Sequence, residues 1–152
     1  MTQDMNLKPL RESQPILIVE DSTDDFEATK RAFSKANLHN PIKHVFNGED
    51  ALSYLRSDAL TKPGLILLDL NMPGLDGRKT LEIIKQTPKL KKIPVVILTT
   101  SDDERDVKAC YELGANTYIQ KPVDFDGLIA AIRRLKEYWF EIALLPKEQG
   151  RG

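Results

Sequence analysis

Three short runs of this sequence are apolar at every position, and they constrain the fold more than any other feature. Two of them are Ile16–Val19 and Leu65–Leu68, and the third begins at Val95 within the segment Ile93–Leu98. A strand with one face in water alternates apolar and polar residues, whereas a strand covered on both faces does not. These runs therefore predict central strands of a parallel sheet that carries helices on both sides.

Two further runs, Thr117–Ile119 and Ile42–Phe46, are shorter or more polar and are the remaining candidate strands. The segments between the runs carry apolar residues at helical spacing, and each is long enough for a crossover between parallel strands. These apolar faces are Phe26, Thr29, Phe33 and Ala36, then Ala51, Leu52 and Leu55, then Leu81 and Ile84. The alternation predicts an α/β fold with a doubly wound, five-stranded parallel sheet, but it does not specify the strand order.

Signals for the ends of helices agree with this pattern. Asn47 precedes an acidic helical start and is predicted to cap it. The segment Ser101–Glu104 has the form of a capping box, with Ser101 as the cap and Glu104 placed to reach back to the Ser101 amide. Gly114 can adopt the left-handed conformation that ends a helix.

The length and charge of the chain limit its function classes. Its 152 residues suffice for one well-filled core. The formal net charge of -1 gives no general attraction to nucleic acid or to an anionic membrane. Cys110 is the only cysteine, which excludes an internal disulfide framework and is typical of a reducing cytoplasm. We therefore expect a cytoplasmic protein with protein partners, and neither nucleic-acid nor membrane binding.

The two ends of the chain differ from its centre. Residues 1–14 are polar and lack the apolar core of a signal peptide or membrane span, so a flexible tail is expected there. Residues 15–138 contain the strand–helix pattern and are predicted to form the domain. Residues 139–152 are predicted to extend the last helix with apolar residues and to end in a tail too short for a DNA-binding helix-turn-helix.

Chemically reactive side chains follow the predicted strands at their carboxyl ends. Glu20 and Asp21 follow the first strand, Asp69 the third, Thr99 the fourth and Lys121 the fifth. These ends meet at one edge of a parallel sheet, where α/β proteins bind ligands. A lone aspartate there is more often a cap or turn residue, but three carboxylates from two strands repel one another and predict a bound cation. Oxygen ligands without histidine or cysteine favour Mg²⁺ or Mn²⁺.

The same residues predict phosphoryl chemistry. A carboxylate can attack phosphorus and form an acyl phosphate, while the Lys121 ammonium and the Thr99 hydroxyl stabilise the anionic oxygens. Asp69 is the predicted nucleophile because it lies between the acid pair and the lysine. The turn Met72–Gly77 that follows contains glycines, which would let the backbone approach the anion closely.

From Pro15 to about Tyr138 the chain resembles the receiver domain of two-component response regulators. The resemblance rests on an acid pair, a phosphoacceptor, a switch hydroxyl, a switch aromatic and a lysine–proline pair, which are Glu20–Asp21, Asp69, Thr99, Tyr118 and Lys121–Pro122. It implies the flavodoxin-like strand order 2-1-3-4-5 and a cis peptide bond before Pro122. It also implies that Mg²⁺ or Mn²⁺ is held by Asp21, Asp69 and the main-chain carbonyl of Asn71, with Glu20 acting through water.

The resemblance further implies that a sensor histidine kinase transfers a phosphoryl group to Asp69. Thr99 would then move toward the phosphoryl group and Tyr118 would turn into the vacated space, which changes the surface offered to a downstream protein. Enzymatic activity would be limited to self-catalysed phosphotransfer and slow autodephosphorylation. Two alternatives stay open. One is a Mg²⁺-dependent phosphohydrolase, although Asn71 supplies no second carboxylate for it, and the other is a binding or dimerisation module that does not use the phosphate site.

The end of the last predicted helix indicates a contact surface. Tyr138, Trp139, Phe140 and Ile142 make this end unusually apolar. Together with the segment Ile93–Ser101, it resembles the stand-alone regulators that are paired with cyanobacterial phytochromes. A phytochrome-type kinase and a homodimer formed through these residues are therefore expected, with packing inside the same chain as the alternative.

Overall fold

A five-stranded parallel sheet forms the centre of the computed structural model, which describes residues 7–8, 13–57, 62–72, 74–142 and 145–146. Its strands are β2 (Ile16–Val19), β3 (Ile42–Val45), β4 (Leu65–Leu68), β5 (Val95–Thr99) and β6 (Thr117–Gln120). They are ordered β3-β2-β4-β5-β6, which is 2-1-3-4-5 when these strands are counted by themselves. The predicted fold class and the strand order implied by the resemblance are both confirmed.

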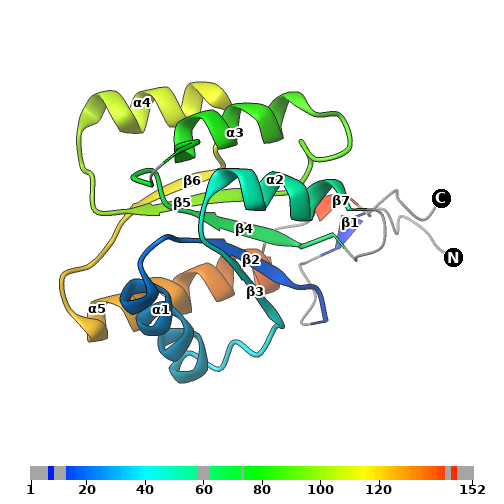
Figure 1. Ribbon diagram of the computed structural model, residues 1–152. Coiled ribbons are helices and arrows are strands. Elements are labelled where there is room, and N and C mark those ends of the chain that lie inside the picture. The colour runs from blue at the N-terminus through cyan, green and yellow to red at the C-terminus, as the bar shows by residue number, and fades with distance from the viewer. Residues whose placement is uncertain (1–6, 9–12, 58–61, 73, 143–144, 147–152) are drawn as a thin grey trace, which may run out of the picture.

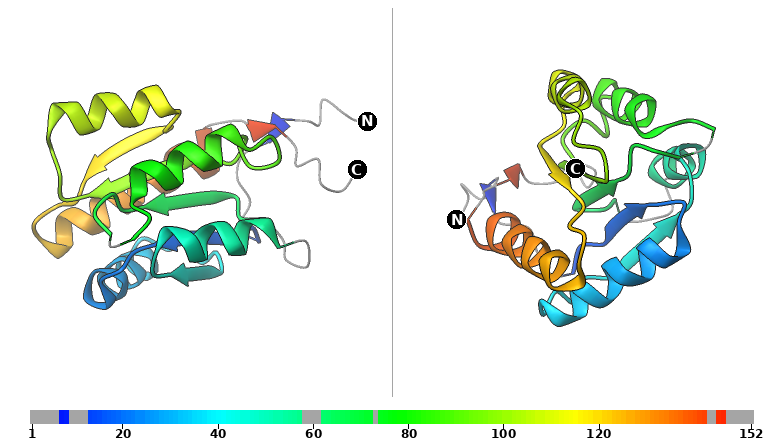
Figure 2. Two further views of the ribbon diagram at one scale, coloured as in Figure 1. Left: turned by 45° about the horizontal axis from the view of Figure 1, so that its top comes forward. Right: turned by 90° about the vertical axis from the view of Figure 1, so that its left-hand side faces the viewer.

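Helices cover both faces of the sheet (Figure 1). One face carries α1 (Thr23–Lys35) and α5 (Phe125–Lys136), and the other carries α2 (Gly48–Arg56), α3 (Gly77–Gln86) and α4 (Glu104–Leu113). Figure 2 shows the same three layers from two further directions. Within the described part of the chain, no helix combines the length and the apolar character needed to cross a bilayer.

The central strands divide their side chains between the two faces, as their unbroken apolar character predicts. Ile16 and Ile18 pack with α1 and α5, whereas Leu17 and Val19 pack with α2 and α3 on the other side. The same alternation holds for β4, where all four residues are buried. Burial on both faces explains why these strands carry no polar residue before their carboxyl ends.

Two of the predicted helix ends are confirmed, and one is wrong. Asn47 caps α2 by accepting a hydrogen bond from the Asp50 amide at 2.7 Å, and Gly114 ends α4 with φ of 109°. The helix α4 is capped by Asp103, however, and not by Ser101. The helix begins two residues later than a cap at Ser101 requires, and the Ser101 hydroxyl instead donates to Asp106 at 2.7 Å and accepts the Asp103 amide at 3.3 Å.

The peptide bond before Pro122 also differs from expectation. No cis bond occurs among the described residues, so Lys121 and Pro122 are joined in the trans form. The implied cis bond is therefore wrong for this chain. The trans isomer is the one that bonds to proline favour intrinsically, by about 0.5–1 kcal/mol.

The two ends of the described chain meet in a pairing that the sequence pattern did not indicate. Strand β1 (Leu7–Lys8) pairs antiparallel with β7 (Leu145–Pro146). This pair lies beyond the amino ends of the parallel strands, opposite the loops that follow their carboxyl ends (Figures 1 and 2). Between α5 and β7, residues Glu137–Ile142 form the π-helical segment η1, so the predicted extension from residue 139 begins inside a helical turn.

Candidate phosphoryl-transfer site

Three carboxylates converge at the carboxyl edge of the sheet. Glu20 and Asp21 follow β2, and Asp69 follows β4, which is hydrogen-bonded to β2. One oxygen from each carboxylate can be chosen so that all three lie within 4.8 Å of one another. These residues form the acid cluster, and the structure brings them together as the sequence predicts.

The main chain holds the acid cluster in register with the sheet. The Asp69 amide donates to the Val19 carbonyl at 3.1 Å, and the Glu20 amide donates to the Val45 carbonyl at 3.0 Å. Each bond extends a parallel ladder by one residue beyond its strand. Gly77 begins α3 directly against this backbone, and a Cβ at that position would collide with the Asp69 carbonyl oxygen. The glycine is thus required by close approach of helix and strand end.

Lys121, which follows β6, brings a cation to the acid cluster. Its Nζ lies 2.7 Å from Glu20 Oε1, 2.8 Å from Asp25 Oδ2 and 3.8 Å from Asp69 Oδ2. The lysine side chain is only 13% exposed. Asp25, in the first turn of α1, was not predicted as a site residue. Its position after the helix cap Ser22 is also typical of an ordinary acidic first turn, so the sequence offered no signal for this contact.

The charges in this site are incompletely balanced. Burial, reinforced by repulsion from Asp69, raises the pKa of Glu20 from 4.5 to about 7, even though the ion pair with Lys121 acts in the opposite direction. Burial lowers the pKa of Lys121, but hydrogen bonds to Asp25 and Glu20 outweigh it, and the net shift is upward. A site in which the buried Glu20 resists ionisation fits a divalent cation, which would offset the repulsion.

Thr99 lies at the end of β5 with its side chain fully buried. Its hydroxyl has no hydrogen-bond partner within the described part of the chain. Its carbonyl accepts the Lys121 amide at 2.6 Å, which ties the ends of β5 and β6 together. A buried hydroxyl without a partner costs free energy and is therefore unusual in a purely structural position. It is available to bond an additional acceptor at this edge.

Asn71 lies in the loop after Asp69, and its amide donates to Asp69 Oδ1 at 3.3 Å. Its exposed side chain is an amide, so the loop supplies no further carboxylate at this position. The hydrogen bond holds Oδ1 of Asp69 toward the loop, and a carboxylate in such a position can act as a nucleophile.

Comparison with known proteins identifies this arrangement. A model of the response regulator receiver domain matches residues 16–133 of the chain. The chain belongs to this family. It is 39% identical over 142 residues to the response regulator Rcp1 of Synechocystis sp., and the match covers 89% of this chain and 97% of Rcp1.

Solved structures of related receivers have the same fold. The phosphorylated cyanobacterial phytochrome response regulator RcpA superposes with a TM-score of 0.83 at 37% identity, and the match covers 89% of this chain and 99% of RcpA. The Mn²⁺-bound form of Rcp1 gives a TM-score of 0.80 at 38% identity, covering 88% and 99% of the two chains. A related receiver has thus been solved with a divalent metal ion bound.

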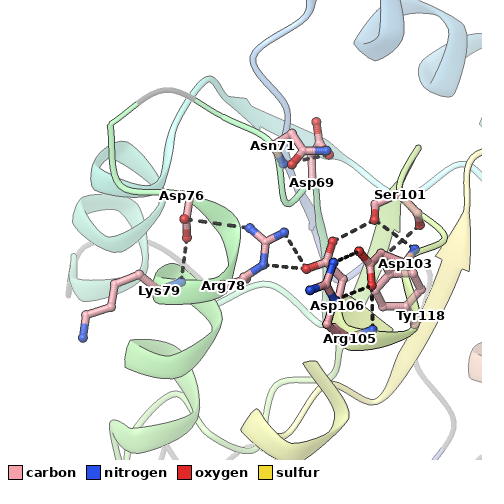
Figure 3. A network of polar contacts seen from close by, with 10 residues as sticks. All are labelled: Asp69, Asn71, Asp76, Arg78, Lys79, Ser101, Asp103, Arg105, Asp106 and Tyr118. Atoms are coloured by element: carbon pink, nitrogen blue, oxygen red, sulfur yellow. Dashed lines mark hydrogen bonds and ion pairs between the residues drawn. The ribbon is translucent and has the colours of Figure 1, made fainter. Parts of the chain in front are cut away.

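Tyr118, the expected switch aromatic, is part of a second polar cluster, the Arg78 network, shown in Figure 3. The Tyr118 hydroxyl donates to the Ser101 carbonyl at 3.0 Å, and the Ser101 hydroxyl donates to Asp106. Arg78 donates to Asp106 Oδ1 through Nη2 at 2.7 Å and through Nε at 3.0 Å. The network therefore connects α3, the loop after β5, α4 and β6.

Sequence reasoning missed both charged members of the Arg78 network. The Ser101 and Arg78 hydrogen bonds hold the pKa of the Asp106 carboxyl below its usual value. Neither Arg78 nor Asp106 follows a strand. They lie on two different helices, about 28 residues apart in the sequence, and meet because these helix faces are turned toward each other. No local motif marks such a contact.

The residues of the predicted contact surface at the end of α5 differ in their exposure to solvent. Tyr138 is 50% exposed and packs edge-on against Trp139, which is only 5% exposed and belongs to the core beside α1 and α5. Trp139 thus packs inside the same chain, as in the alternative interpretation of this end, and its place in a partner surface stays a prediction. Phe140 is half-buried against the same core, and the side chain of Ile142 lies outside the described residues.

Proposed function

We propose that this receiver accepts a phosphoryl group on Asp69 from the phosphohistidine of a sensor histidine kinase and signals through phosphorylation-dependent protein contacts. One observation carries the proposal: the acid cluster, the Lys121 ammonium 3.8 Å from Asp69 and the buried Thr99 hydroxyl occupy one edge of the sheet. A nucleophile, a cation and an uncommitted donor are the groups that phosphoryl transfer to a carboxylate needs.

In the proposed step, a carboxylate oxygen of Asp69 forms a bond to phosphorus while the bond from phosphorus to the donor's imidazole nitrogen breaks. The hydrogen bond from the Asn71 amide to Oδ1 orients the Asp69 carboxylate. Lys121 and Thr99 then donate to the phosphoryl oxygens, which satisfies the Thr99 hydroxyl. The product is an acyl phosphate that water hydrolyses later.

The acid cluster is proposed to hold Mg²⁺ or Mn²⁺, with Asp21, Asp69 and the Asn71 main-chain carbonyl as ligands and Glu20 acting through water. A bound ion of this kind neutralises charge on the transferred group. The oxygen-only donor set and the raised pKa of Glu20 support this assignment.

The output is proposed to pass through Thr99 and Tyr118 to the surface around α4. Movement of Thr99 toward a phosphoryl group would alter the loop that carries Ser101, where the Tyr118 hydroxyl is bonded. The similarity to RcpA and Rcp1 supports a phytochrome-type sensor as the kinase. The buried single cysteine, Cys110, suits the reducing cytoplasm in which we place this exchange.

The test is the intact mass of the protein after incubation with Mg²⁺ and a small phosphodonor. The parent chain and the control Asp126→Asn, which changes an exposed aspartate of α5, are expected to gain one phosphate. Asp69→Asn is expected to gain none. If Asp69→Asn gains phosphate as readily as the parent, the assignment fails. Rapid multiple turnover of phosphate esters would instead favour a phosphohydrolase.

We also propose that the receiver forms a homodimer through the exposed side of η1. The exposed Tyr138 supports this, since it is a large aromatic group beside the half-buried Phe140. Sedimentation with and without phosphodonor is expected to show association that weakens in Tyr138→Ser. Equal association of the parent and this variant would remove Tyr138 from the interface, and a monomeric parent would remove the dimer.

A further inference from the structure

The shortest contacts of the Lys121 ammonium are with Glu20 and Asp25, and not with the proposed phosphoacceptor Asp69. Its Nζ donates to Glu20 Oε1 at 2.7 Å and to Asp25 Oδ2 at 2.8 Å. The 3.8 Å between Nζ and Asp69 Oδ2 is too long for a hydrogen bond. Glu20 belongs to the acid cluster, but Asp25 is not among the carboxylates that could share an ion there. Asp25 therefore binds the Lys121 ammonium without belonging to the acid cluster.

The position of Asp25 is fixed by its own main chain. Its amide donates to the Ser22 hydroxyl at 3.1 Å, and its carbonyl accepts the Thr29 hydroxyl at 3.0 Å. These bonds belong to the first turn of α1, so they persist whether or not the carboxylate is paired. The Asp25 side chain is 49% exposed, so water can solvate it when Lys121 leaves.

We propose that Asp25 is a positioning residue that competes with the phosphoryl group for Lys121 and so slows phosphorylation of Asp69. The inference rests on the proposed function of Asp69. To donate to an oxygen of a phosphoryl group on Asp69, the Lys121 ammonium must move and give up one of its present hydrogen bonds. The half-exposed Asp25 is the acceptor it can leave most cheaply, because the alternative, Glu20, is buried and would lose its cation.

The experiment compares initial rates of mass gain with Mg²⁺ and acetyl phosphate. Asp25→Asn is expected to react about two- to fivefold faster than the parent, since a half-exposed ion pair of this kind is worth little. Asp24→Asn is the matched control, because it removes the same charge from the same helical turn at an exposed position. Asp24→Asn is expected to react at the parent rate, and Asp25→Glu is expected to restore a slower rate than Asp25→Asn.

A second pair of variants separates competition for Lys121 from a general effect of charge on the anionic donor. In a Lys121→Met background, Asp25→Asn is expected to give no acceleration. A charge effect that does not act through Lys121 would persist there. A readout without donor or metal is the exchange of the Lys121 Nζ protons with water, followed by NMR, which is expected to become faster in Asp25→Asn and to stay unchanged in Asp24→Asn.

The possible outcomes distinguish this inference from the proposed function. A parent chain that gains no phosphate on Asp69 overturns both. A parent that is phosphorylated while Asp25→Asn reacts at the rate of Asp24→Asn, or accelerates equally without Lys121, overturns only the role of Asp25.

Discussion

The acid cluster and the Arg78 network lie at the same end of the sheet, yet they balance their charges differently. In the acid cluster, Glu20 and Asp69 share the Lys121 ammonium with Asp25, and the pKa of Glu20 rises to about 7. In the Arg78 network, Asp106 accepts from both Arg78 and Ser101, and the pKa of its carboxyl falls. The carboxylate whose ionisation is disfavoured thus lies in the proposed phosphorylation site, whereas the carboxylate whose ionisation is favoured lies in the network that joins the helices.

Removing the cation of the acid cluster tests this comparison most severely. Lys121→Met is expected to slow mass gain from acetyl phosphate by about 100-fold, because the site loses a donor aimed at the transferred group. The control Lys108→Met removes an exposed lysine of α4 and is expected to react at the parent rate. Equal rates for the two variants would contradict a chemical role for Lys121.

The pH dependence of stability provides the second test. The pKa of Glu20 is about 7 in the folded protein and 4.5 ordinarily, so the folded state binds this proton more tightly. Its contribution to stability is complete below pH 4.5 and is lost as the pH rises through 7. Without divalent ions, we expect the free energy of unfolding to fall over this range by about 3 kcal/mol from this group.

Urea denaturation at several pH values measures this slope. Glu20→Gln is expected to flatten it, and Mg²⁺ is expected to reduce it in the parent because a bound cation favours the ionised carboxyl. A slope that is identical in Glu20→Gln and the parent would show that other groups cause it.

Breaking the Arg78 network is expected to have the smallest effect. Arg78→Met should lower the free energy of unfolding by about 1 kcal/mol, because the partly exposed ion pair with Asp106 is lost. The rate of phosphorylation by acetyl phosphate should stay at the parent value. If Arg78→Met slows that rate as much as Lys121→Met does, the two clusters are not chemically distinct.

The sequence allowed prediction of those parts of the fold and site that follow from strands. Ile16–Val19 and Leu65–Leu68 were predicted with their observed bounds, because burial on both faces leaves an unbroken apolar run. Glu20 and Asp69 were placed correctly for the same reason, since a residue that directly follows a parallel strand must lie at the carboxyl edge.

Features that depend on helix rotation or on competing hydrogen bonds could not be predicted in this way. Asp25 and Asp106 lie on helices, where spacing gives the apolar face but not the partner of a polar side chain. Ser101 matched a capping box, yet α4 begins two residues later with Asp103 as its cap, and the Ser101 hydroxyl donates to Asp106. Trp139 continues the apolar face of Leu135 at helical spacing, and this spacing does not tell whether the same chain or a partner covers the ring.

The antiparallel pair of Leu7–Lys8 with Leu145–Pro146 brings the two ends of the described chain together, at the end of the sheet opposite the proposed phosphorylation site. A short covalent linker between those two segments would close the backbone into a ring. New termini could then be opened in another connection at the amino ends of the strands. Such a circularly permuted receiver would keep the strand order that brings Asp69 near Lys121, so the order in which the elements are synthesised is separable from the geometry of the proposed phosphorylation site.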